Sequence, residues 1–108
     1  MTTLYCVVIF YNMKADLLLK ERVVQSEYSF AELIVWQVPL PVHGSRHQFK
    51  YRLAYVVKGC CVLRYDNEAG KSDHKHVGEM ETNYTFTTPA QLLTDFWHDV
   101  DQWRQDNE

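Results

Sequence analysis

Hydrophobic and polar positions alternate through the first half of the chain and predict β-strands. Residues 13–24 form one predicted strand, with apolar groups at 17–19 and 23–24. Residues 28–38 form a second, with apolar side chains on both faces. One face carries Tyr28, Phe30, Ile34, Trp36 and Val38, and the other carries Ala31, Leu33 and Val35. Apolar residues on both faces predict an inner strand that is covered on both sides.

The middle of the chain predicts a β-hairpin. Pro39 and Pro41 end the second strand because proline cannot donate to a strand ladder. A Gly-Ser loop at 43–46 follows, and residues 47–57 then alternate again as a third strand. Lys58 and Gly59 form a tight turn into a fourth strand at 60–66.

The C-terminal part predicts an amphipathic helix. Thr88 and Pro89 supply an N-cap and a first helical residue, after a short predicted strand at 84–87. Apolar residues then recur at spacings of three and four, at Leu92, Leu93, Phe96, Trp97, Val100 and Trp103. The acids Asp95, Asp99 and Asp101 are expected mostly on the solvent side. The predicted fold class is α+β, a curved antiparallel β-sheet packed against a C-terminal amphipathic α-helix.

Length and composition indicate one globular domain. The 108 residues suffice for one core, and 46% hydrophobic residues exclude a disordered chain. We expect a single domain over 1–108, with residues 1–12 as an N-terminal extension. Its apolar run at 4–11 predicts an extra buried strand, or a tail added by an upstream start codon, and is too short to span a membrane.

Cysteine usage predicts a cytoplasmic protein. The chain has an odd number of cysteines, Cys6, Cys60 and Cys61, and no CxxC pair. Neither a disulfide framework nor a zinc ribbon is therefore indicated.

Charge is distributed unevenly along the chain. Residues 43–76 contain seven Lys and Arg against three acids, a segment charge of +4 that leaves −7 for the remainder. Such a local positive field can hold a phosphate backbone on an acidic protein, and it is equally typical of a solvated sheet edge.

Residues 65–76 carry the candidate chemistry, because acidic, basic and cationic groups are crowded there. Cleavage of RNA by 2′-OH attack needs a base, an acid and a cation at the phosphate. His74 and His76 are separated by one residue, so in an extended segment they point the same way. Lys71, Arg52 and Arg64 are candidates for the cation.

The same residues allow other interpretations. Asp66, Asp73, His74 and His76 are all metal-ligand types, and Asp66 is also an ordinary turn residue. The rings of Tyr51, Tyr55 and Tyr65 are suited to stacking on bases or to a buried core. His98 is expected to be structural, and His43 and His47 join the site only if their loop folds back on it.

Several separated segments resemble the TumE family of toxins from toxin–antitoxin systems. They are MKADLLL (13–19), ELIVWQVP (32–39), FKYRLAYVV (49–57), YDNE (65–68), Gly70-Lys71, DHKH (73–76), LLTDF (92–96), DVD (99–101) and Trp103. The resemblance covers residues 13–103. It implies a toxin that acts on RNA, with a helix-turn-helix antitoxin as partner. The family's signature segment falls on Asp66, Lys71, Asp73, His74 and His76, which therefore become the candidate catalytic residues.

The resulting hypothesis is a cofactor-free endoribonuclease toxin. His74 and His76 would share the acid and base roles, and Arg52, Lys50, Arg64 and Lys75 would bind the RNA. A non-enzymatic RNA- or protein-binding module and a metal-dependent hydrolase are the alternatives. A homodimer is also expected, because so aromatic a sheet leaves an apolar edge or face to cover.

Overall fold

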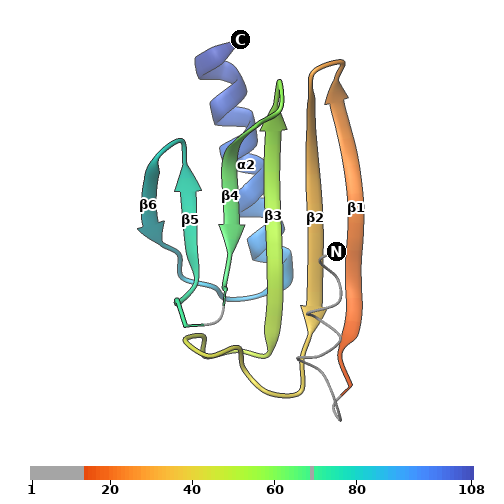
Figure 1. Ribbon diagram of the computed structural model, residues 1–108, viewed down its shortest axis with the longest axis vertical. Coiled ribbons are helices and arrows are strands. Elements are labelled where there is room, and N and C mark those ends of the chain that lie inside the picture. Colours follow the sequence, from red (N-terminus) through yellow and green to blue (C-terminus); the bar gives the residue numbers. More distant parts are fainter. Residues whose placement is uncertain (1–13, 69) are drawn as a thin grey trace.

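The computed structural model describes residues 14–68 and 70–108, which form one antiparallel sheet and one helix. The predicted extra strand or tail at 1–12 lies outside the described residues. The sheet contains six strands in chain order: β1 (Asp16–Ser26), β2 (Ser29–Gln37), β3 (Phe49–Val57), β4 (Cys60–Asp66), β5 (His74–Val77) and β6 (Met80–Asn83). The helix α2 (Pro89–Asn107) crosses one face of the sheet behind β3 and β4 (Figure 1). The α+β prediction is confirmed.

The turn between β3 and β4 lies where the sequence predicts it. Lys58 and Gly59, which join β3 to β4, both have positive φ, 51° and 81°. Two consecutive positive φ angles are typical of the two-residue turns that match strand twist. Gly59 adopts this conformation without strain, so the turn fixes the register of β3 on β4.

The core lies between α2 and the sheet. Its buried residues are Ala31, Leu33, Val35, Tyr51, Leu53, Tyr55, Leu63, Tyr65, Leu92, Phe96 and Val100. The Phe96 ring packs edge-to-face on Tyr65 with 5.7 Å between centroids, and Trp103 packs similarly on Tyr55 at 5.9 Å. Such pairs are favourable beyond the area they bury. The tyrosines offered as base-stacking rings are therefore core residues.

The helix begins as predicted, but its acids do not all face solvent. Thr88 caps α2 by accepting a hydrogen bond from the Gln91 backbone N–H at 3.1 Å. Asp99 accepts a hydrogen bond from the Tyr65 hydroxyl and pairs with Lys75. Asp95 accepts a hydrogen bond from the Tyr84 hydroxyl. The prediction of a solvent position was wrong for these two acids, because Tyr65 of β4 and Tyr84 of the segment before α2 present hydroxyl donors to them.

Two strand predictions need correction. Residues 84–87 are not a strand: Tyr84 makes a single backbone hydrogen bond to Asp73, and the segment instead leads from β6 to α2. β2 is an inner strand, as predicted, but only its α2 side is fully buried. Within the described residues, Phe30 and Ile34 on the other side remain half-buried.

Candidate functional site

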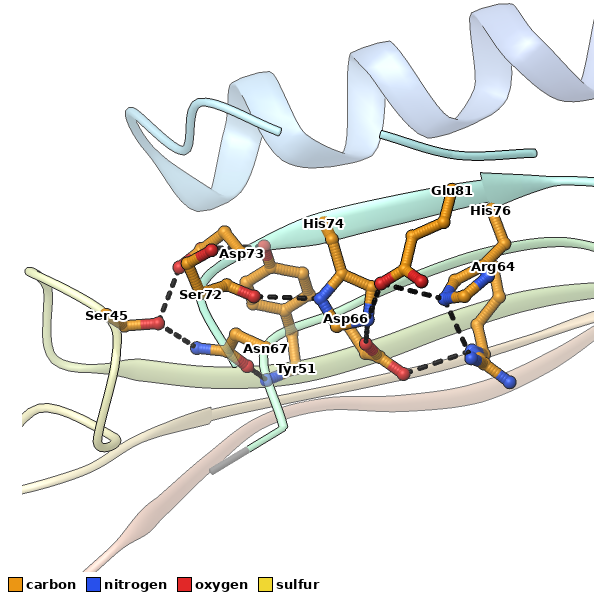
Figure 2. A network of polar contacts seen from close by, with 10 residues as sticks. All are labelled: Ser45, Tyr51, Arg64, Asp66, Asn67, Ser72, Asp73, His74, His76 and Glu81. Carbon is orange, nitrogen blue, oxygen red and sulfur yellow. Dashed lines mark hydrogen bonds and ion pairs between the residues drawn. The ribbon is translucent and has the colours of Figure 1, made fainter. Parts of the chain in front are cut away.

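The β4–β5–β6 meander assembles the polar residues that the sequence singled out. Asp66 lies opposite His74 in the β4–β5 ladder, and Arg64 lies opposite His76. His76 in turn lies opposite Glu81 of β6. We call these five residues the histidine cluster; antiparallel pairing brings them together although they span eighteen positions of sequence (Figure 2).

Strand alternation sorts the candidates onto two faces. His74 and His76 point to the side opposite α2, here called the distal face, with 5.0 Å between their ring centroids. The prediction that they point the same way is confirmed. Lys75 lies between them in β5 and points to the other face, where its Nζ is 2.9 Å from Asp99. The structure therefore separates Lys75 from the histidines, contrary to its predicted grouping with the RNA-binding cations.

His74 is buried and engaged through both ring nitrogens. Its Nδ1 lies 2.8 Å from the carbonyl oxygen of Ser72, which only accepts hydrogen bonds, so Nδ1 carries a proton. Its Nε2 lies 2.7 Å from a carboxylate oxygen of Asp66 (Figure 2). A lone pair on Nε2 would be repelled by that oxygen. A proton or a bound cation between the two atoms would remove that repulsion.

His76 is more accessible and has the opposite hydrogen-bonding role. The Nη2 of Arg64 lies 3.0 Å from Nε2 of His76, and a guanidinium only donates. Nε2 of His76 therefore carries a lone pair. The Nε of Arg64 also lies 3.1 Å from Asp66, so one guanidinium links the two residues.

Glu81 is the member of the histidine cluster that the sequence analysis missed. One of its carboxylate oxygens lies 3.7 Å from Nε2 of His74 and 3.8 Å from Nε2 of His76. Its strand β6 has the sequence METN, which lacks the apolar alternation that identifies strands. No local signal indicates this contact; it follows from the β5–β6 register.

Asp73 lies apart from the histidine cluster and serves a different network. Its carboxylate accepts from the Tyr51 hydroxyl at 2.7 Å and from the Ser45 hydroxyl, and it pairs with Nε2 of His47 at 2.6 Å. Loop 43–46 therefore does fold back, and His47 reaches Asp73 rather than the other histidines. The structure gives Asp73 the role of an anchor for this loop.

Loop 43–46 lies so close to the β4–β5 connection that only glycine fits at position 44. Gly44 has φ +100°, and a Cβ there would lie 3.1 Å from the backbone carbonyl of Lys71. The backbone N–H of Gly70 also donates to the carbonyl of His43 at 2.9 Å. These contacts hold the backbone of the connection, while Lys71 itself is exposed.

The remaining predicted cations lie on β3. Arg52 is exposed on the distal face, in register with Asp66. Its side chain makes no hydrogen bond or ion pair with residues 14–68 or 70–108. Lys50, two residues earlier, shares this face. Arg52 is thus available to an external anion next to the histidine cluster.

Three tyrosines are expected to make the free energy of unfolding depend on pH in the alkaline range. Burial, followed by the hydrogen bond that each hydroxyl donates to a carboxylate, raises the pKa of Tyr51, Tyr65 and Tyr84 well above the ordinary 10.0. A raised folded-state pKa gives stability that is complete below the unfolded value and is lost as pH rises above it. We expect the free energy of unfolding to fall above pH 10.0 by about 1.4 kcal/mol per pH unit for each of the buried tyrosines Tyr51 and Tyr65, and by less for the more exposed Tyr84. Urea unfolding on both sides of that pH measures this; a constant free energy would contradict it.

Comparison with known families identifies the chain. The family model described as Toxin TumE matches residues 11–104, which include all six strands and most of α2. The chain belongs to the toxin TumE family. A search of curated proteins and a search of solved structures returned no match.

Family membership has direct consequences for this TumE protein. It assigns the chain a toxin role, and a toxin of a toxin–antitoxin system implies an antitoxin partner. Among the described residues, no helix is long and apolar enough to cross a membrane.

Proposed function

We propose that this TumE toxin is an endoribonuclease whose RNA substrate lies across the distal face and is cleaved at the histidine cluster. The observation that carries this proposal is the cross-strand register. One row of side chains on that face runs through Lys20, Ile34, Arg52, Asp66, His74 and Asn83. The next row runs through Arg22, Glu32, Ala54, Arg64, His76 and Glu81. Cations thus lead across the sheet toward the paired imidazoles.

A groove supports binding of an extended strand. It has a volume of about 410 Å³ over β1–β3. Lys20, Arg22 and Arg52 contribute to its lining, as does Glu32, which pairs with Arg22 at 2.7 Å. Arg52 lies two strands from His74, about 10 Å away at the usual strand spacing. Neighbouring phosphates of one RNA strand can therefore meet Arg52 and the histidine cluster together.

Hydrogen bonding suggests which histidine takes which role. His76 carries a lone pair on Nε2 and is the proposed base that removes the 2′ proton. His74 is the proposed acid for the leaving 5′ oxygen, because the Ser72 carbonyl holds its Nδ1–H and Asp66 would hold a proton on Nε2. Arg64 supplies positive charge beside both. Asp66 is then a positioning residue that holds the imidazolium.

Glu81 controls access to the acid in this scheme. Its carboxylate stands 3.7 Å from Nε2 of His74, whose side chain is only 5% exposed, whereas the Glu81 side chain is 47% exposed. RNA phosphate would repel this carboxylate. We propose that Glu81 swings aside when substrate binds and so uncovers His74.

The chemistry of the products tests the proposal. Attack by the 2′-OH leaves a 2′,3′-cyclic phosphate and a 5′-OH, and it requires the ribose hydroxyl. We expect the purified toxin to cleave an RNA oligonucleotide into such products and to leave its 2′-deoxy counterpart intact. Equal cleavage of both oligonucleotides, or 5′-phosphate ends, would contradict 2′-OH attack.

The proposed RNA track makes a prediction about salt dependence. Replacing Arg52 by alanine should remove one phosphate contact and reduce the slope of log affinity against log salt by about 0.7, the value for single strands. Lys75→Ala is the matched control because it removes the same charge from the other face. Binding of the uncleavable oligonucleotide at several salt concentrations measures the slope. An equal loss in both variants would argue against a track on the distal face.

The burial of His74 favours a second candidate function, RNA binding without cleavage. A toxin of that kind would show salt-dependent affinity for RNA and no products. In either case the proposed partner is a helix-turn-helix antitoxin that covers the basic segment 43–76, and the proposed place of action is the cytoplasm. A homodimer remains a proposal for the state without antitoxin.

A further inference from the structure

We propose that the histidine cluster is a binding site for a divalent transition-metal ion such as Zn²⁺, with His74, His76 and Glu81 as ligands and Asp66 as the fourth. One donor atom from each of the first three residues lies within 4.8 Å of the others. The binding claim is independent of RNA cleavage; its consequence for activity rests on the proposed function.

The distances are close to those of a tetrahedral site. Ligand bonds of 2.0–2.2 Å place neighbouring donor atoms about 3.4 Å apart in a tetrahedron. The Glu81 oxygen lies 3.7 Å from Nε2 of His74 and 3.8 Å from Nε2 of His76. A shift of a few tenths of an ångström in a side chain that is 47% exposed would complete this geometry. Imidazole and carboxylate together favour zinc and its neighbours over magnesium or calcium.

The surroundings of His74 are an independent observation that points to an ion. A histidine that ligates a metal through Nε2 commonly donates its Nδ1–H to a backbone carbonyl, which fixes the ring. His74 does this to Ser72 at 2.8 Å. Its Nε2 then lies 2.7 Å from the buried Oδ1 of Asp66, a contact that needs a proton between the two atoms while no ion is bound. A metal ion that binds both atoms would take the place of that proton and would move the two atoms slightly apart.

Arg64 takes the place of the ion in the metal-free cluster. Its guanidinium donates to Nε2 of His76 and pairs with Asp66, so it neutralises the same two donors. Metal binding requires the guanidinium to leave His76. Loss of Arg64 should therefore strengthen metal binding, whereas loss of a ligand should weaken it.

Metal binding would affect RNA cleavage because it uses the lone pairs of the histidine nitrogens. A bound ion would occupy Nε2 of both histidines, the atoms that the proposed mechanism uses for proton transfer. We therefore expect Zn²⁺ to inhibit RNA cleavage as it fills the site, and a chelator to restore the activity. The site would make the toxin sensitive to the metal content of its surroundings.

The test is calorimetric titration of Zn²⁺ into the full chain, with Co²⁺ absorption as a second readout of the ligands. Cys60 and Cys61 are exposed thiols, so all variants carry serine at both positions. We expect one ion per chain, affinity at least tenfold weaker in His76→Ala and in Glu81→Gln, tighter binding in Arg64→Ala, and no change in His98→Ala. Circular dichroism verifies the fold of each variant.

Each result decides the proposal. Absence of stoichiometric binding, or unchanged affinity in both His76→Ala and Glu81→Gln, would overturn the metal site. If the ion binds as expected while no RNA is cleaved under any condition, the metal site stands and the proposed function fails.

Discussion

RNA cleavage by the His76→Ala variant is expected to be at least about 100-fold slower than by the wild-type toxin, because general acid–base catalysis contributes that much or more. The imidazole of His76 is the one whose Nε2 holds a lone pair, and 23% of its side chain is exposed to an incoming substrate. The variant should remain folded, since the side chain lies outside the buried core and loses one hydrogen bond to Arg64.

A histidine on the helix provides the matched control for this prediction. His98 is exposed on α2 and belongs to neither polar network. Initial rates on one RNA oligonucleotide, with circular dichroism of each protein, should separate His76→Ala from a nearly unchanged His98→Ala. Wild-type rates in folded His76→Ala would remove His76 from the mechanism and would also point to a contaminating nuclease.

Replacement of Asp73 by alanine is expected to lower the free energy of unfolding by about 3 kcal/mol. Asp73 is 7% exposed and receives contacts from Ser45, His47 and Tyr51, which belong to a loop and a strand distant in sequence. Without the carboxylate, these buried donors lose their acceptor. Loop 43–46 should then detach from the β4–β5 connection.

The Tyr51→Phe variant is a conservative comparison for Asp73→Ala. It removes one donor from the same carboxylate and keeps the ring, so we expect a loss of about 1 kcal/mol. Urea unfolding of both variants gives the two free energies. If Asp73→Ala kept wild-type stability and still lost RNA cleavage, the carboxylate would belong to the reacting centre, as its place in the signature segment suggested.

Local patterns predicted the elements whose signals lie within a few residues. Lys58-Gly59 fixed the β3–β4 hairpin because a two-residue turn with positive φ admits few sequences. Thr88 and Pro89 marked the start of α2, where a cap and a proline are each favoured for a stated backbone reason. Strand periodicity alone predicted that His74 and His76 point to the same face of the sheet.

Local patterns could not predict contacts between residues that are far apart in the sequence. The sequence grouped Asp73 with His74 because they are adjacent, but adjacent residues of an extended chain point to opposite sides. Lys75 was separated from the histidines for the same reason. Asp99 and Asp95 of α2 contact Tyr65 and Tyr84 because β4 and the segment after β6 pack against the helix, which local sequence does not indicate. Glu81 entered the site through a strand with no apolar signal.

The central claim is that RNA meets the paired imidazoles on the distal face, and nuclear magnetic resonance of the histidine rings tests it most directly. The wild-type toxin would be titrated with a 2′-deoxy oligonucleotide that it binds and cannot cleave. We predict that the ring signals of His74 and His76 shift together with binding, while those of His98 stay in place. Shifts at His98 with none at His74 and His76 would show that the ligand binds elsewhere and would contradict the proposed site.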